Sequence, residues 1–417
     1  MKTLAIFLIG AAACAQTGRN LAEVKPETVG FSTERLLRLH RAMGQTVEDK
    51  ELAGVLTVLA RHGKIVDLHA YGKKDLASGA PMDRDTVFRI WSMTKPITGV
   101  AMMILYEQGK WSPADPIAKY IPEFAKLKVA GGADPIHPPT MGELMSHTAG
   151  FTYGVFGETA VDKAYREANV LGSASLQQMI EKVAKLPLLY EPGSQWVYSI
   201  SADIQGYIVE KLSGKPLGTY LRENIFQPLG MKDTGFHLSA PQLARMAGGA
   251  DLDASGRLVA ARVNVEAYAK EPGMPSGGGG LLSTAPDYLR FAQMLANGGE
   301  LDGVRILAPS SVELMRSNRL PRAITDAGVF GIGTSHMNPG FGFGFDFGVH
   351  TDPAYNGRTV GKGTYLWSGA EGTWFWIDPA NDVVFVGMIQ RAMGAAKRDM
   401  STLAQQTVYQ ALTNPEK

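Results

Sequence analysis

Ser92 and Lys95 stand three residues apart, a spacing that can place a nucleophilic hydroxyl beside a base. Residues three apart share one face of a helix, so the Lys95 amine could reach the Ser92 hydroxyl. Pro96 follows directly, and proline is tolerated in the first turn of a helix, so a helix must begin close to Ser92. Free backbone N–H groups there could stabilise negative charge on a reacting oxygen. A capping serine beside a solvated lysine would show the same pattern.

Two further segments carry groups that could complete such a site. Tyr198 could accept the serine proton as a phenolate near Lys95 and return it to a leaving group, although for this residue taken alone a packed core tyrosine is the more ordinary interpretation. The segment Trp367-Ser368-Gly369-Ala370 is predicted at the end of a strand, where glycine lets a substrate approach the backbone. A backbone N–H there could form an oxyanion hole with that of Ser92. A simple turn after a buried strand would also fit.

The elements that must position these groups follow from periodicity. Apolar residues at helical spacing predict helices over residues 33–43, 97–107, 286–296 and 395–412. Runs rich in β-branched and aromatic residues predict strands over residues 54–60, 65–71, 87–91, 341–349, 364–367, 373–377 and 383–389. The stretch between the two groups of strands is rich in helix signals and proline.

Strands near both ends of the chain and a helical middle predict an α+β fold. We expect one mostly antiparallel sheet, flanked by terminal helices and built from residues 16–110 and 251–417. Residues 111–250 would form an inserted helical region. We expect the active site in the cleft between these two regions.

Composition places the chain among globular proteins and excludes several functions. Its 417 residues, 45% hydrophobic and 19% charged, do not fit a disordered chain. Lys and Arg (41) nearly balance Asp and Glu (40), so no charge-driven nucleic-acid partner is expected. One cysteine, scattered histidines and no H-E-x-x-H motif predict no metal site, and the proposed chemistry needs no cofactor. The sequence assigns no oligomeric state.

The first residues have the pattern of an export signal. Lys2 precedes an apolar run, residues 4–13, that is too short to span a bilayer. Cleavage after Ala15 would remove residues 1–15 and with them the only cysteine, Cys14, giving a periplasmic or secreted protein. In the alternative, Cys14 is lipidated and anchors a lipoprotein. No later segment is predicted to span a membrane.

Taken together, the three candidate segments resemble the serine β-lactamase and penicillin-binding-protein superfamily. The likeness is greatest to class C β-lactamases and family VIII carboxylesterases. It extends over most of the mature chain, with further matches at residues 88–98, 144–151 and 278–284. The resemblance implies a β-lactamase/transpeptidase-like fold, an acyl-enzyme on Ser92, and acid/base catalysis shared by Lys95 and Tyr198. It also implies an oxyanion hole made by the backbone N–H groups of Ser92 and Ala370.

Departures from the lactamase pattern indicate the substrate. Where lactamases have Tyr-x-Asn, this chain has Tyr198-Ser199-Ile200, and where they have Lys-Thr-Gly, it has Trp367-Ser368-Gly369. Trp-x-Gly at this position resembles the family VIII esterases. The missing lysine removes a charge-assisted contact to a substrate carboxylate, which disfavours anionic substrates. We therefore expect a carboxylesterase for small-molecule esters with short or medium acyl chains. The candidate substrate-binding residues are Trp367, Ser368, Gly369 and Tyr153.

Other functions of the same superfamily stay open. A β-lactamase or D-alanyl-D-alanine peptidase would share the acylation machinery, and weak lactam hydrolysis could accompany an esterase. Acyl transfer to an alcohol differs only in what attacks the acyl-enzyme. A non-enzymatic, penicillin-sensor-like protein would keep the acyl adduct. The α/β-hydrolase fold is disfavoured, because the sequence has no G-x-S-x-G motif.

Overall fold

The computed structural model describes residues 21–326, 340–391 and 398–415. The predicted signal peptide with Cys14 lies outside these residues, as does the predicted start of the closing helix at residues 395–397. The central element is a seven-stranded antiparallel sheet in the order β2-β1-β13-β12-β11-β10-β9. Its strands are β1 (Gly54–Arg61), β2 (Lys64–Gly72), β9 (Phe341–Phe343), β10 (Gly348–His350), β11 (Tyr365–Ser368), β12 (Trp374–Asp378) and β13 (Val383–Met388).

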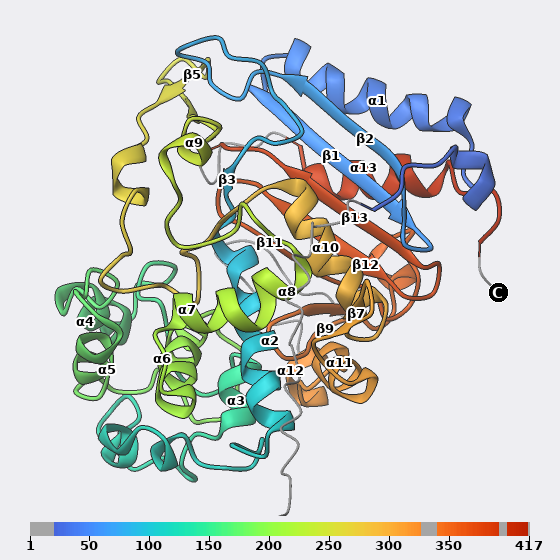
Figure 1. The fold of residues 1–417 in the computed structure, drawn as a ribbon. Coiled ribbons are helices and arrows are strands. Elements are labelled where there is room, and N and C mark those ends of the chain that lie inside the picture. The colour runs from blue at the N-terminus through green and yellow to red at the C-terminus, as the bar shows by residue number, and fades with distance from the viewer. Residues whose placement is uncertain (1–20, 327–339, 392–397, 416–417) are drawn as a thin grey trace, which may run out of the picture.

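The predicted assembly of the sheet from both parts of the chain is confirmed. Figure 1 shows the blue hairpin β1–β2 beside the red strands of the C-terminal part. Leu56 of β1 lies opposite Met388 of β13, and the pairing continues to Arg61 and Val383. The strands predicted over residues 364–367, 373–377 and 383–389 correspond to β11, β12 and β13, which pair in succession as an antiparallel meander.

Helices cover both faces of the sheet. On one face lie α1 (Thr33–Glu48), capped by the Ser32 hydroxyl, and α13 (Met400–Tyr409). Their apolar side chains pack with sheet residues such as Trp376 and Phe385, whose rings are stacked 4.2 Å apart. On the other face lies α10 (Ala285–Ala296), which packs against β1, β12 and β13.

A second group of helices lies beside the sheet (Figure 1). Its centre is α2 (Thr94–Glu107), buried along nearly its whole length and packed against α6 (Ser201–Ser213). The other helices there are α3 (Met141–Met145), α4 (Ala160–Glu167), α5 (Leu176–Val183), α7 (Leu217–Leu221) and α8 (Gln227–Leu229). None of the helices in the described part of the chain is long and apolar enough to cross a bilayer.

The remaining elements are short. They are the strand pairs β3 (Phe88–Arg89) with β6 (Leu282–Ser283), β4 (Gly249–Leu252) with β5 (Leu258–Ala261) and β7 (Glu300–Leu301) with β8 (Val304–Arg305), and the helices α11 (Pro309–Arg316) and α12 (Arg322–Asp326). The short helix α9 (Ala240–Leu243) lies apart from the second group of helices, near β3 and β5 (Figure 1).

Two sequence expectations differ from the structure. The strand expected over residues 87–91 is only β3, which pairs with β6 and not with the central sheet, because the chain turns into a 3₁₀ helix at Trp91. The single strand expected over residues 341–349 is the hairpin β9–β10, whose turn contains Asp346 in a left-handed conformation at φ 62°. In both places a short turn inside an apolar run leaves no trace in the hydrophobic pattern.

Candidate active site

The position of Ser92 follows from how one helix begins. The chain leaves β3, makes one 3₁₀ turn over Trp91–Met93 that carries Ser92, and enters α2 at Thr94. Pro96 therefore lies in the first turn of α2, where its missing N–H costs no hydrogen bond. Lys95 is completely buried, and its Nζ donates hydrogen bonds to Ser92 Oγ at 3.2 Å and to the Gly278 carbonyl at 2.6 Å.

Tyr198 packs against the same amine. The Lys95 Nζ lies 4.4 Å from the ring centroid of Tyr198 and 5.2 Å from that of Tyr153, a cation–π arrangement. The Tyr198 hydroxyl accepts a hydrogen bond from Trp367 Nε1 at 3.3 Å. Lys95 thus contacts the ring of Tyr198, and within the described residues no hydrogen bond joins the amine to the Tyr198 hydroxyl.

One cavity of about 700 Å³ brings several predicted residues together. Ser92, Tyr198, Tyr153 and Ala370 all line it, while Lys95 supports Ser92 from the buried side. The other lining residues are Trp91, Val155, Phe156, Leu171, Asp203, Met274, Ser276, Gly278, Gly279, Gly280 and Glu371. This volume is within the range of small-molecule sites in enzymes.

Three expected substrate-binding residues do not line this cavity. Trp367 is buried behind Tyr198, and Ser368 is exposed at the end of β11. Gly369 packs tightly against the backbone that precedes Ser92, since a Cβ at this position would lie 2.5 Å from the Ile90 carbonyl oxygen. Trp367 and Gly369 thus support neighbours of the cavity and do not line it.

Ala370 lies in a turn that is fastened to the segment before Ser92. Its neighbour Glu371 forms an ion pair with Arg89 of β3 at 2.6 Å, and Arg89 is buried. Within the described residues the Ala370 N–H has no hydrogen-bond acceptor. This amide is therefore available to a substrate oxygen in the cavity.

Sequence reasoning missed a carboxylate that organises the site. Asp203, in the first turn of α6, accepts hydrogen bonds from Ser276 Oγ at 2.5 Å and from the Gly278 N–H at 3.1 Å. Burial raises the pKa of Asp203, and the nearby Lys95 charge opposes that rise. The carboxylate thereby fixes the backbone at Gly278, whose carbonyl accepts a hydrogen bond from Lys95. Its sequence signal was only its place soon after Tyr198.

Gly278 has a steric reason to be glycine. A Cβ there would lie 2.6 Å from Asp203 Oδ2 and 2.7 Å from the Tyr153 hydroxyl oxygen. From the sequence alone, the glycine run at residues 277–280 indicates only close backbone packing. The structure gives it a closer relation to the site, because this backbone passes between two side chains and reaches Lys95.

A second buried carboxyl lies behind the site. Asp346 is fully buried, accepts a hydrogen bond from Gln205 Nε2 at 3.2 Å, and has no partner for Oδ2 among the described residues. Burial raises the pKa of Asp346 to about 8, although Gln205 and the Lys95 charge lower it. Gly99 of α2 leaves room for this carboxyl, since a Cβ there would lie 2.8 Å from Oδ2.

His147 supports Tyr198 and does not line the cavity. It is completely buried, its Nδ1 accepts from the Ser199 N–H at 3.3 Å, and its ring centroid lies 5.1 Å from that of Tyr198. Burial holds the pKa of His147 well below its ordinary value, and the Lys95 charge acts in the same direction. The imidazole is therefore neutral at physiological pH and packs as an aromatic ring.

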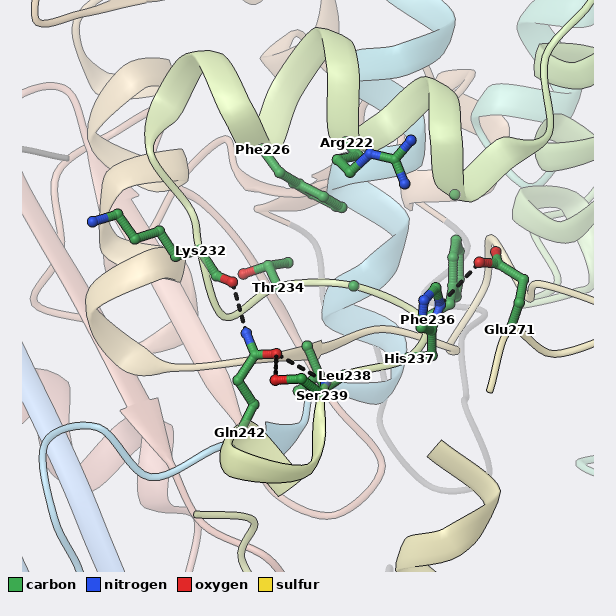
Figure 2. Close-up of a pocket in the computed structure, with 12 residues that line it drawn as sticks. Arg222, Phe226, Lys232, Thr234, Phe236, His237, Leu238, Ser239, Gln242 and Glu271 are labelled. Carbon is green, nitrogen blue, oxygen red and sulfur yellow. Dashed lines mark hydrogen bonds and ion pairs between the residues drawn. The ribbon is translucent and has the colours of Figure 1, made fainter. Parts of the chain in front are cut away.

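A smaller cavity of about 230 Å³ lies between the helical turn at residues 222–226 and the loop at 232–242 (Figure 2). His237 and Glu271 form an ion pair at 2.9 Å at its edge. The Ser239 hydroxyl in its wall donates to Gln242 Oε1 at 2.6 Å. The serine–lysine–tyrosine arrangement belongs to the larger cavity.

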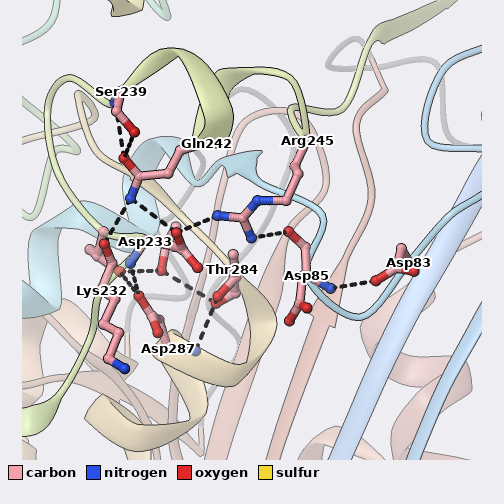
Figure 3. A network of polar contacts seen from close by, with 11 residues as sticks. Asp83, Asp85, Lys232, Asp233, Ser239, Gln242, Arg245, Thr284 and Asp287 are labelled. Atoms are coloured by element: carbon pink, nitrogen blue, oxygen red, sulfur yellow. Dashed lines mark hydrogen bonds and ion pairs between the residues drawn. The ribbon is translucent and has the colours of Figure 1, made fainter. Parts of the chain in front are cut away.

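A polar network beneath this loop supports the strands that lead to Ser92 (Figure 3). Arg245 pairs with Asp233 and donates to the Asp85 carbonyl at 2.8 Å. Asp287 of α10 accepts from the Asp233 N–H at 2.7 Å and from Thr234 Oγ1 at 2.9 Å. Gly235, next to Thr234, forms a bridge with Leu282 of β6, and β6 pairs with β3. The network therefore holds β3 and β6, the two strands that lie close in the sequence to lining residues of the larger cavity.

No group of three or more His, Cys, Asp or Glu side chains in the described residues is arranged to hold a metal ion.

Comparison with known proteins identifies the family of this chain. The family model described as Beta-lactamase matches residues 39–409. Protein Rv1367c of Mycobacterium tuberculosis is 37% identical over 352 residues, which cover 81% of this chain and 86% of that protein. Esterase EstB of Burkholderia gladioli is 30% identical over 400 residues, which cover 91% of this chain and 92% of EstB.

A solved structure shares the fold over the same length. It is EstCE1, described as a hydrolase with promiscuous acyltransferase activity, with a TM-score of 0.79 and 27% identity. The match covers 90% of this chain and 99% of EstCE1. The predicted β-lactamase/transpeptidase-like fold is thus confirmed. This chain belongs to the β-lactamase family and is a serine hydrolase of the superfamily of serine β-lactamases and penicillin-binding proteins.

Proposed function

We propose that this protein is a carboxylesterase that forms an acyl-enzyme on Ser92. The observation that carries the proposal is the hydrogen bond from the fully buried Lys95 amine to Ser92 Oγ, at a cavity that Tyr198 and Ala370 also line. An amine held at this distance can help to remove the serine proton. The resemblance to Esterase EstB in sequence supports ester hydrolysis.

The reaction has two steps. Tyr198, together with Lys95, takes the proton from Ser92 Oγ, and the oxygen attacks the ester carbonyl carbon. The N–H groups of Ser92 and Ala370 stabilise the negative oxygen, and the alcohol leaves with the proton. Water then gives a proton to the same base, attacks the acyl carbon and releases the carboxylic acid, which restores Ser92.

The charges around the cavity favour an uncharged acyl group. At the position of the lactamase lysine stands Trp367, which is buried and donates to Tyr198. The charged side chains that line the cavity are the carboxylates of Asp203 and Glu371, which accept hydrogen bonds from Ser276 and Arg89, respectively. Among the described residues that line the cavity, a substrate carboxylate would find no cation to compensate its lost hydration.

A panel of esters and lactams tests the proposal on the purified mature protein. We expect kcat/KM for p-nitrophenyl butyrate to exceed that for nitrocefin by orders of magnitude, and Ser92→Ala to abolish ester turnover. Faster turnover of nitrocefin would instead assign a β-lactamase. Mass spectrometry adds a second check, because a permanently acylated Ser92 with one equivalent of product would assign a sensor protein.

Acyl transfer is the second candidate reaction, because the structurally similar EstCE1 is a hydrolase with promiscuous acyltransferase activity. It requires an alcohol to compete with water for the acyl-enzyme. We propose hydrolysis as the main reaction, since no observation favours an alcohol. Product analysis with added methanol distinguishes the two: an ester product above the share expected from simple competition would favour transfer.

We also propose that the protein is exported, on the pattern of residues 1–15. Cell fractionation and mass spectrometry of the mature N-terminus test this. A mature chain that begins at Gln16 would support signal cleavage, and a lipidated Cys14 would support the lipoprotein alternative.

A further inference from the structure

The mouth of the larger cavity is unusually apolar. Few large apolar side chains in the described part of the chain are exposed, and three of them line this cavity: Trp91 at 37%, Val155 at 52% and Leu171 at 45%. Single exposed apolar residues are normal on a protein surface, but several around one concave site indicate a binding surface. These three residues are called the apolar rim below.

Trp91 is held at the rim at a cost in backbone energy. Its φ is 46°, a left-handed conformation that is rare for a bulky side chain and costs about 1–3 kcal/mol. Its indole is partly exposed, so burial does not fully offset that cost. Gly279, which has no side chain, lies beside the indole, since a Cβ there would be 3.8 Å from the Trp91 ring. Strain and exposure together indicate a functional side chain.

The apolar surface continues inward from the rim. Tyr153, Phe156 and Met274 line the inner cavity and are partly buried against the hydrophobic core. The Phe156 ring centroid lies 5.8 Å from that of Tyr153 and 6.1 Å from that of Tyr198. An apolar wall therefore runs from the solvent to the candidate acid/base residue.

The cavity is much larger than a small acyl group requires. At roughly 30 Å³ per water-sized group, its volume of about 700 Å³ has room for about 20 non-hydrogen atoms. An acetyl group would leave most of the apolar wall in contact with water. A long or bulky apolar acyl group would remove that surface from water, at about 25 cal/mol per Å².

We propose that the apolar rim and inner wall form a subsite for a large apolar acyl group, so that the favoured substrates are uncharged esters of acyl chains near eight carbons. The proposal rests on the proposed function. The acyl group is assigned because it stays on Ser92 through the second step, and Trp91 is the covalent neighbour of Ser92. The alcohol, in contrast, leaves after the first step.

A series of p-nitrophenyl esters from acetate to octanoate, kept below their micelle concentrations, tests the subsite. We expect kcat/KM to rise about twofold per methylene, about half of the roughly fourfold that full burial of a methylene would give. Leu171→Ser and Val155→Ser should each lower the octanoate-to-acetate ratio of kcat/KM about threefold or more. Trp91→Asn should lower it further, because asparagine tolerates the left-handed backbone but removes the indole.

Ile136→Ser is the matched control. Ile136 is 86% exposed and is not a lining residue of the cavity, so the same loss of apolar area there should leave the ratio unchanged. The subsite would be overturned if kcat/KM of the wild type did not change with acyl chain length, or if the rim variants left the octanoate-to-acetate ratio of kcat/KM unchanged. The proposed ester hydrolysis on Ser92 would stand in both cases. A dependence on chain length only in an alkyl acetate series would assign the wall to the alcohol and also overturn the subsite. Ester turnover that survives Ser92→Ala would remove the proposed function and the subsite together.

Discussion

The indole N–H of Trp367 donates a hydrogen bond to the hydroxyl of Tyr198 at 3.3 Å, from behind the wall of the cavity. This contact gives a role to the residue at the position where lactamases have a lysine. A donor on this side occupies a lone pair of the phenol oxygen and fixes the orientation of the hydroxyl. Trp367 is therefore a positioning residue for Tyr198.

Trp367→Phe removes this donor and keeps an aromatic ring of similar shape. We expect kcat for p-nitrophenyl butyrate to fall about tenfold with a small change in KM, because the hydrogen bond acts on the base and not on the substrate. Trp376→Phe, on the α1 face of the sheet, is the control for general effects of losing an indole. An unchanged kcat in Trp367→Phe would show that the hydrogen bond does not assist Tyr198.

Lys95→Ala tests the base. We expect kcat to fall by about 10²–10⁴-fold, since that is the usual contribution of a general base. Circular dichroism and the Tm show whether the fold survives loss of the buried amine. A folded variant with kcat near that of the wild type would reassign proton transfer to another group.

Gly278→Ala should disturb Lys95 without altering any catalytic side chain. The added Cβ would lie 2.6 Å from Asp203 Oδ2, so the backbone must move and take with it the carbonyl that accepts from Lys95. We expect kcat to fall at least tenfold. Gly279→Ala is the matched comparison, because its Cβ would meet no atom closer than 3.8 Å, and its effect should be much smaller. Equal losses in both variants would contradict the steric argument.

Glu371→Gln should weaken the support of the Ala370 amide. The substitution breaks the ion pair with the buried Arg89 and leaves that guanidinium without its counter-charge. We expect a lower Tm and a fall in kcat larger than the change in KM, because the oxyanion hole acts mainly in the transition state. A change confined to KM would indicate that Glu371 instead contacts the substrate.

Asp346→Asn should change how stability depends on pH. Burial in the folded protein raises the pKa of Asp346 to about 8 from its ordinary value of 3.8, so between about pH 4 and pH 8 the folded state holds a proton that the unfolded state has lost. The contribution of Asp346 to the free energy of unfolding is therefore largest at low pH, and it falls as the pH rises, by at most about 1.4 kcal/mol per pH unit. Asparagine does not titrate, so the Tm of the variant should gain on the wild type from pH 5 to pH 8. Parallel Tm curves would contradict the buried, neutral carboxyl.

Much of the fold could be predicted because its signals are local. The strands at both ends of the chain and the hydroxyl, amine and phenol of the site stand in short segments with a clear pattern, and glycine and proline mark their limits. Asp203, Asp346 and Arg89 could not be placed in the same way. Each acts through a partner far along the chain, such as Gly278 for Asp203, and only the folded backbone brings these partners together.

The first and last described segments of the chain meet on one side of the molecule. Phe31 forms a bridge with Leu412, and the Thr413 N–H donates to the Gly30 carbonyl at 2.8 Å. Arg61 likewise donates to Asn381, 320 residues later in the sequence. A short linker between these segments would make the polypeptide a closed ring. New termini at the exposed β4–β5 tip, residues 254–256, would then give a circular permutant with the same sheet and the same cavity.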